Sequence, residues 1–377
     1  MRFNKNIYIN YNYNVDYFYI LSSILKNPLL FTIFILFSFS SCMKDDMRPI
    51  EEFYNKNNGV FIICEGNFMY GNASLSYYDN IKNNVENAVF LKANGIPLGD
   101  VAQSLTIHDS IAYIMINNSG KIYAININTF KYKGEISGLT SPRYMKILNP
   151  SKAYVTDMYS KCIYVINPQT YSITNIIDIG IDSRPYYRHS SEEIVISGDY
   201  AFINSWSYDD KILIINTKTD LLIDSVEVFK QPKKIVLDKN KKLWVLCDGG
   251  FQGSPYFGER GIIKINTETF EIEQKFLFQE NNTLTDLKIN KTGDTIYYIN
   301  THIYRYHVDE NVMPSQEYIN SEGKNFYGIG IDPYNSDLYV SDAIDHMQSG
   351  VVYRYDSRKN YIDHFEVGII PNSFVFK

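Results

Sequence analysis

The feature that most constrains the fold is a sequence pattern that recurs seven times. Its first copy, Gly59–Asp79 (GVFIICEGNFMYGNASLSYYD), has two apolar runs of strand length separated by a loop rich in glycine and asparagine. In later copies, such as KIYAININT and KCIYVINPQT, an aromatic strand closes on Asn, Asp or, once, His. The closing residues are Asp79, Asn126, Asn167, Asn216, Asn266, His307 and Asp356. Successive closing residues lie about 41 to 50 positions apart, which is the period of a four-stranded propeller blade. The sequence therefore predicts an all-β, seven-bladed β-propeller with four-stranded antiparallel blades.

The second copy shows how each blade divides into four strands, here called a to d in chain order. Apolar runs predict strand a at Ser104–Ile107, strand b at Ile111–Ile116, strand c at Lys121–Ile125 and strand d at Lys131–Ile136. Polar turn residues separate these runs. The chain contains 33 Tyr and 22 Phe, and aromatic residues suit a pleated, half-buried surface.

The two ends of the repeat array complement each other. The first copy begins with strand b at Gly59 and has no strand a before it. Residues Asn372–Phe376 at the end of the chain supply such a strand, and they follow Ile370-Pro371 just as another strand a follows Ser141-Pro142. Pairing of the last strand with the first blade would close the ring and leave no free sheet edge between the first and last blades. The propeller is therefore predicted to span residues 59–377, with its first blade completed by the C-terminal strand.

The first 58 residues predict export and anchoring. Asn27–Phe39 is an apolar run too short to span a membrane comfortably, and it leads through Ser40-Ser41 into Cys42, a pattern that resembles a bacterial lipobox. We expect residues 1–41 to be a lipoprotein signal peptide, Cys42 to carry the lipid that anchors the protein to the outer membrane, and residues 42–58 to be a polar tether. Residues 43–46 (MKDD) resemble the charged surface-export signal of Bacteroidetes lipoproteins, which favours exposure on the cell surface; the alternative is a plain solvated linker.

Charge and reactive side chains argue against several function classes. A formal net charge of -6 provides no basic stripe for a phosphate backbone, so no nucleic-acid partner is expected. Cys64, Cys162 and Cys247 lie in different repeats, too dispersed for a disulfide framework or a zinc site, and are predicted to be buried free thiols. The six histidines are spread singly, and no HExxH or GxSxG motif occurs. We therefore expect no enzyme, no metal site and no cofactor.

The loops fall on two opposite faces because the strands of a blade alternate in direction. We call the first rim the face that carries the loops between strands b and c together with the loops between blades. Its loops are long and combine aromatic residues with polar neighbours, whereas the opposite face carries short turns such as Asn149-Pro150-Ser151. Rigid aromatic rings on loops suit a recognition surface when taken together, although a single tyrosine in such a loop more often packs against a blade edge than touches a ligand. The residues predicted to bind a ligand are Asn67, Phe68, Tyr70, Arg143, Tyr144, Asp157, Tyr159, Tyr186, Tyr187, Trp206, Tyr208, Asp248, Phe251, Tyr256, Asp286, Tyr327, Asp342 and His346.

Three segments make the chain resemble a known family: the first copy of the repeat, the YVINPQT-type strand ends and the closing IPNSFVFK. These segments are similar to the YncE-like (DUF5074) propeller lipoproteins of Bacteroidetes. The resemblance covers essentially all of Gly59–Lys377, and the motif EGNF at Glu65–Phe68 is its most specific part. Such proteins include a surface lipoprotein that binds cobalamin and works with an outer-membrane TonB-dependent vitamin B12 transporter. The resemblance implies a capture module whose rim holds a small nutrient, first among candidates cobalamin or a related corrinoid, and passes it to such a transporter.

Two alternatives stay open at this stage. Propeller rims commonly host protein partners, so the chain could be a protein-interaction or cell-envelope scaffold without a small ligand. It could also be a hydrolase or lactonase that uses a metal at the propeller axis.

Overall fold

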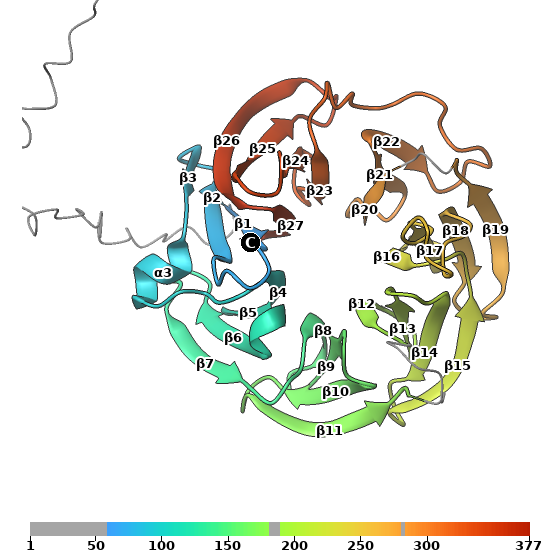
Figure 1. Cartoon of the computed structure of the whole chain (residues 1–377), viewed down its shortest axis with the longest axis horizontal. Coiled ribbons are helices and arrows are strands. Elements are labelled where there is room, and N and C mark those ends of the chain that lie inside the picture. Colours follow the sequence, from blue (N-terminus) through green and yellow to red (C-terminus); the bar gives the residue numbers. More distant parts are fainter. Residues whose placement is uncertain (1–58, 181–188, 280–282) are drawn as a thin grey trace, which may run out of the picture. The chain divides into compact units, whose positions relative to one another are not determined.

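The computed structural model describes residues 59–180, 189–279 and 283–377. These residues form seven antiparallel sheets arranged as blades around a central axis (Figure 1). The strands of each blade are given from the innermost outward. The first blade consists of β27 (Pro371–Phe376), β1 (Gly59–Cys64), β2 (Ser74–Asp79) and β3 (Asn84–Glu86), and the second of β4 (Ala102–His108), β5 (Ile111–Ile116), β6 (Lys121–Asn126) and β7 (Tyr132–Ile136). The third blade consists of β8 (Pro142–Asn149), β9 (Lys152–Asp157), β10 (Cys162–Asn167) and β11 (Ser172–Asp178), and the fourth of β12 (Ser191–Ser197), β13 (Tyr200–Ser205), β14 (Lys211–Asn216) and β15 (Leu221–Glu227). The fifth blade consists of β16 (Pro232–Leu237), β17 (Lys242–Cys247), β18 (Gly261–Asn266) and β19 (Ile272–Leu277). The sixth consists of β20 (Leu284–Ile289), β21 (Thr295–Asn300) and β22 (His302–His307), and the seventh of β23 (Phe326–Ile331), β24 (Leu338–Asp342), β25 (Ser349–Tyr355) and β26 (Tyr361–Ile369). The seven-bladed propeller predicted from the repeat is confirmed.

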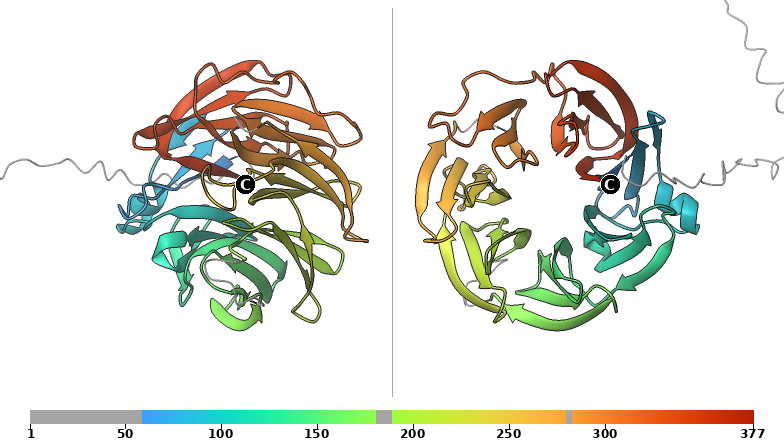
Figure 2. Two further views of the ribbon diagram at one scale, coloured as in Figure 1. Left: turned by 45° about the vertical axis from the view of Figure 1, so that its right-hand side comes forward. Right: turned by 180° about the vertical axis from the view of Figure 1, so that it is seen from behind.

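The view from behind shows the same ring, with the innermost strand of each blade facing the axis (Figure 2, right). Two short helical segments, α3 (Val89–Asn94) and η1 (Asn117–Ser119), lie between strands of the first two blades. In the described part of the chain, no helix has the length and hydropathy needed to cross a membrane.

The closing Asn and Asp residues of the repeat have a common structural role in the turns between strands c and d. Asn126 Oδ1 accepts hydrogen bonds from the backbone N–H groups of Asn128 (2.9 Å) and Thr129 (3.0 Å). The same two-residue and three-residue contacts are made by the side chains of Asn167, Asn216 and Asn266. A short amide or carboxylate side chain that bonds its own backbone two residues on stabilises a tight turn. The repeat is therefore visible in the sequence because each blade needs this turn.

The ring is closed by β27, as predicted. Val60 pairs with Phe376 and Ile62 pairs with Phe374 across the β1–β27 ladder. Phe374 is 8 % exposed and belongs to a core cluster that also contains Tyr339 and Val352 of the seventh blade. A Cβ atom added at Gly330 of β23 would lie 2.6 Å from the Phe374 Cβ, so only glycine leaves room for this ring between the seventh and first blades.

The sixth blade differs from the other six in its outer part. It has three hydrogen-bonded strands, and the position of its fourth strand is taken by an isolated bridge between Ile303 and Ile319. The N–H groups of Tyr318 and Ile319 both donate to the Ile303 carbonyl (2.7 and 3.1 Å), which covers the start of the β22 edge.

The cysteines lie where the repeat predicts, but they are not equally buried. Cys64 and Cys247 are buried free thiols, whereas Cys162, at the start of β10, is also free but partly exposed. The prediction of a buried thiol was therefore wrong for Cys162, because this residue lies where the loop 158–161 enters β10 and is only partly covered.

Candidate functional site

A pocket of about 260 Å³ lies on the propeller axis. Its walls come mainly from residues near the start of the innermost strands of all seven blades, and these strands surround the axis (Figure 1). Glu65, Met158 and Trp206 add side chains from loops that follow strand b, so the pocket lies at the first-rim end of the axis. The lining residues are Glu65, Val101, Gln103, Arg143, Tyr144, Met158, Glu192, Trp206, Lys233, Lys234, Thr285, Asp286, Tyr327 and Asn372.

A network of charged and polar side chains joins four neighbouring blades beside this pocket. Lys234 Nζ donates to Tyr144 Oη (3.0 Å) and to Glu193 Oε1 (3.1 Å), which joins the third, fourth and fifth blades. Lys288 Nζ lies 3.3 Å from Asp286 Oδ1 and 3.8 Å from Glu193 Oε1, which extends the network to the sixth blade. Burial acts to raise the pKa of Glu193, but the positive charges of Lys234 and Lys288 outweigh it and the pKa lies below its usual value. The network therefore holds Glu193 ionised.

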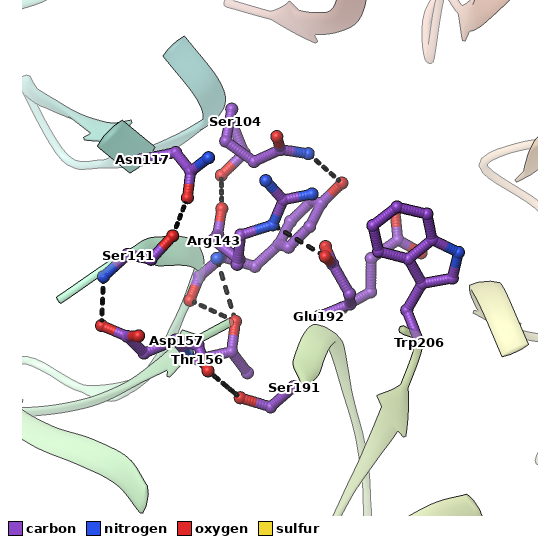
Figure 3. A network of polar contacts seen from close by, with 12 residues as sticks. Ser104, Asn117, Ser141, Arg143, Thr156, Asp157, Ser191, Glu192 and Trp206 are labelled. Carbon is purple, nitrogen blue, oxygen red and sulfur yellow. Dashed lines mark hydrogen bonds and ion pairs between the residues drawn. The ribbon is translucent and has the colours of Figure 1, made fainter. Parts of the chain in front are cut away.

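Arg143 and Glu192 form a second buried pair on the pocket wall. Arg143 Nε donates to Glu192 Oε1 at 2.7 Å, and the two side chains are 10 % and 4 % exposed. In Figure 3 Glu192 lies between Arg143 and the indole of Trp206. Burial raises the pKa of Glu192 although the Arg143 charge opposes the shift. Among the described residues, no hydrogen bond engages the two Nη atoms of Arg143, so the guanidinium keeps donors for another partner.

Glu65 is an acidic group of the pocket that has only neutral partners. Its carboxylate accepts hydrogen bonds from Asn372 Nδ2 (2.7 Å) and Tyr327 Oη (3.3 Å). Burial raises the pKa of Glu65, and the more distant charges of Arg143 and Lys234 offset this only in part. The pKa of Tyr327 lies well above its usual value, because the negative charge of Glu65 and burial both raise it.

Lys233 and Trp206 are held at the pocket by one carboxylate. Asp248 Oδ2 accepts a hydrogen bond from Trp206 Nε1 (3.3 Å) and lies 3.9 Å from Lys233 Nζ. Burial lowers the pKa of Lys233, and Asp248 opposes this shift. The ammonium of Lys233 is therefore less well compensated than that of Lys234.

Comparison with known proteins places this chain in a family. A model described as "Domain of unknown function (DUF5074)" matches residues 58–376. The chain belongs to this DUF5074 family. Comparison with curated protein sequences finds no significant match.

Solved structures similar to this DUF5074 propeller show the fold alone, because their sequence identities are low. A quinoprotein alcohol dehydrogenase-like protein from Bacteroides thetaiotaomicron is similar with a TM-score of 0.63 and 16% identity, covering 85% of this chain and 79% of that chain. The periplasmic gluconolactonase of Pseudomonas aeruginosa has a TM-score of 0.59 and 12% identity, covering 84% and 99%. The hydrazine synthase of Kuenenia stuttgartiensis has a TM-score of 0.54 and 15% identity, covering 70% and 85%. Within residues 59–180, 189–279 and 283–377, no three His, Cys, Asp or Glu side chains are arranged to hold a metal ion.

The residues predicted from the first-rim loops of this DUF5074 protein fall into several groups. Five line the axial pocket: Arg143, Tyr144, Trp206, Asp286 and Tyr327. Asp248 contacts two of the pocket side chains, Trp206 and Lys233, as described above. Their role in binding stays a prediction, but the structure brings all six to one place.

A second group forms an aromatic cluster that leads outward from the pocket. The ring of Phe251 lies 6.5 Å from that of Trp206 and 5.9 Å from that of Tyr208, and Tyr208 lies 5.6 Å from Tyr256. Phe251 and Tyr256 are 51 % and 44 % exposed. The cluster therefore offers an apolar surface continuous with the Trp206 wall of the pocket.

The third group lies on rim loops without lining the pocket. Phe68, Tyr70 and Tyr159 are largely exposed. Asn67 Nδ2 donates to the His346 carbonyl (2.6 Å), so the loop after β1 and the loop after β24 are joined. The His346 ring packs edge-on against Tyr327, with centroids 5.5 Å apart.

Two predicted carboxylates stabilise loops and lie outside the pocket. Asp157 Oδ2 accepts from the N–H groups of Thr140 (2.9 Å) and Ser141 (2.8 Å), and Asp342 Oδ1 accepts from Asn325 N (3.0 Å). An Asp at the last position of strand b thus accepts hydrogen bonds from the backbone of the loop that enters its own blade. Tyr186, Tyr187, Cys42 and the predicted signal peptide and tether lie outside the described residues.

The predicted set of ligand-binding residues left out several pocket residues that lie at the start of the innermost strands. Gln103, Glu192, Lys233, Thr285 and Asn372 are each the second residue of an innermost strand. Arg143 and Tyr327 occupy the same position in β8 and β23. A polar residue recurs in the sequence at the start of strand a or immediately before it, as Gln103 does before Ser104, and this signal could have identified the axial ring.

Proposed function

We propose that this protein is a surface lipoprotein that binds a small nutrient at the axial pocket of its first rim and delivers it to an outer-membrane transporter. The observation that carries the proposal is the pocket itself, where buried charged groups with unused hydrogen-bonding capacity converge beside an aromatic wall. A concave site with a few convergent polar groups and perturbed pKa values is the usual form of a small-molecule site. Anchoring through Cys42 and delivery to a TonB-dependent transporter rest on the lipobox-like sequence and the family resemblance.

Cobalamin or a related corrinoid is the candidate nutrient that the resemblance favours. A corrinoid is a flat, amphipathic disc with peripheral amides, and it is much larger than a cavity of about 260 Å³. It would therefore lie across the mouth of the pocket and place only one peripheral group inside. The exposed rings of Phe68, Tyr70, Tyr159, Phe251 and Tyr256 support this arrangement, because they extend the contact area beyond the pocket.

Substitution of Trp206 by alanine is expected to weaken binding of the nutrient without unfolding the protein. Trp206 is a half-buried loop residue on the pocket wall, so its removal costs contact area and leaves the blade core unchanged. Isothermal titration of the purified protein with cyanocobalamin should show affinity lowered by at least about tenfold. The matched control is Tyr334→Ala, an exposed ring on the opposite face, which should leave affinity unchanged. Absence of heat and of a thermal shift for wild-type protein with cyanocobalamin would remove the corrinoid.

Substitution of Cys42 by alanine tests the location. The variant is expected to leave the membrane fraction, because a thioether-linked lipid is the only anchor that the sequence predicts. Fractionation and protease accessibility on intact cells measure this. A variant that stays in the outer membrane would contradict the lipid anchor.

A further inference from the structure

Some charged side chains of the axial pocket have a close partner of opposite charge and others do not. This difference bears on the class of ligand that the pocket could bind. Lys234, Glu193, Asp286 and Lys288 satisfy one another within the network described above. Glu65, by contrast, makes no ion pair within the described residues, and its carboxylate has only the Asn372 amide and the Tyr327 phenol as partners. A buried carboxylate without a cation is costly, and a cationic ligand group beside it would remove that cost.

The groups with spare positive charge lie on the other side of the pocket. Lys233 has one carboxylate near it, Asp248 at 3.9 Å, which is beyond hydrogen-bonding distance. Arg143 uses only its Nε on Glu192. Glu65 follows β1, Lys233 belongs to β16 and Arg143 belongs to β8. The strands β1 and β16 lie on nearly opposite sides of the ring, and β8 lies between them along its circumference (Figure 1).

Two further polar atoms of the pocket lack partners. The side-chain atoms Asn372 Oδ1 and Thr285 Oγ1 are buried and have no hydrogen-bond partner in the described chain. Both residues line the pocket, Asn372 on the Glu65 side and Thr285 in the blade next to Lys233. Buried polar atoms are almost always paired in native structures, so these two mark places where a ligand completes the site.

We propose that the axial pocket binds a free α-amino acid, whose ammonium group lies against Glu65 and the Asn372 carbonyl oxygen and whose carboxylate lies against Arg143 and Lys233. The indole of Trp206 and the side chain of Met158 then form the wall for the amino-acid side chain. A cavity of about 260 Å³ holds a molecule of this size but not a much larger one. The raised pKa of Glu65 fits the same arrangement, because a ligand ammonium would supply the missing opposite charge.

The experiment separates the two charged ends of the ligand with matched probes. Glycine, L-leucine and L-phenylalanine are titrated into the full-length protein by calorimetry, together with L-3-phenyllactate, which replaces the ammonium by hydroxyl, and phenethylamine, which lacks the carboxylate. At least one amino acid is expected to bind. If it is L-phenylalanine, it should bind about 10- to 100-fold more tightly than either analogue. If it is glycine or L-leucine, the hydroxy acid and the amine that correspond to it take the place of these two analogues.

Two variants assign the ends of the ligand to residues. Glu65→Gln is expected to lower the affinity for the amino acid about 10- to 100-fold and to leave the affinity for the 2-hydroxy acid within about threefold of the wild-type value. Lys233→Gln is expected to weaken binding of both the amino acid and the hydroxy acid and to leave the affinity for the amine unchanged. Should Glu65→Gln fail to fold, Lys233→Gln carries the test alone, because Lys233 lacks a short-range partner.

Three results overturn the proposal: none of the three amino acids binds, the hydroxy acid binds wild-type protein as tightly as the amino acid, or Glu65→Gln lowers both affinities equally. The proposal rests on the axial pocket being the ligand site of the proposed function, but the two fail differently. Binding of cyanocobalamin that Trp206→Ala weakens, with no response to any amino acid, would overturn the amino-acid assignment and leave the nutrient-binding function standing. Failure of every probe would overturn both.

Discussion

A chain that ends at Ile370 is expected to lose its cooperative thermal transition or to melt at a far lower temperature. Truncation removes β27, so β1 in the first blade loses the pairing that joins Val60 to Phe376 and Ile62 to Phe374. The completely buried side chains of Val60 and Ile62 would then meet solvent. Lost ladder hydrogen bonds and apolar burial together amount to about 5–10 kcal/mol, which is comparable with the whole stability of a typical domain. Differential scanning calorimetry of the purified chain measures the effect.

Two Phe→Ala substitutions, one in β27 and one on the first rim, serve as controls for this truncation. Phe374→Ala in β27 should lower the free energy of unfolding by about 3 kcal/mol, because the ring is buried between the first and seventh blades. Phe68→Ala on the first rim should change it by less than about 0.5 kcal/mol, because that ring is 60 % exposed. A truncated chain that melts like the full-length protein would show that the ring does not need its last strand.

Substitution of Lys234 by methionine is the second change with a large expected effect. The ammonium of Lys234 bridges Glu193 and Tyr144 and lies 3.9 Å from Asp286, and its side chain is only 15 % exposed. Removal of one member of such a buried network leaves charges without compensation and should cost about 3–5 kcal/mol at pH 7. Urea unfolding at pH 7 measures this cost.

The pH dependence of that cost has a defined sign. The pKa of Glu193 lies below its usual value, because Lys234 and Lys288 outweigh the effect of burial. A carboxyl group with a lowered folded-state pKa stabilises the protein above its unfolded pKa and loses this effect as the pH falls through the folded value. The difference between wild type and Lys234→Met should therefore be full at pH 7 and shrink below about pH 4.3. Lys218→Met is the control, because Lys218 pairs with Asp199 on the surface and its loss should cost less than about 1 kcal/mol at either pH. A constant difference down to pH 3 would contradict the role of Glu193.

The sequence was sufficient for the fold because each blade repeats a local requirement. The side chains of Asn126, Asn167, Asn216 and Asn266 all stabilise the same kind of turn, which explains why an Asn or Asp recurs at this spacing in six of the seven copies. The missing first strand and the spare last strand were likewise visible as a mismatch in the repeat. The outer edge of the sixth blade was not predictable, because Ile303 and Ile319 form a single bridge rather than a periodic strand.

The pocket was only partly predictable, for a different physical reason. Arg143 and Tyr327 were found because the predicted first-rim loops extended as far as the second residue of their strands. Glu192 and Lys233 occupy the same position in their strands, but the predicted loops did not reach them, and their function depends on which blades face each other across the axis. That relation involves residues far apart in the chain, so no local pattern encodes whether a given Lys meets a carboxylate or is left without one.

Closure by β27 also fixes when the molecule can finish folding. Since Phe376 must pair with Val60, almost the whole propeller must be synthesised before the first blade is complete. Until β27 has been made, the part of the propeller already synthesised is therefore an open array of blades. We therefore expect the pairing of β27 with β1 to be among the last contacts that form during folding.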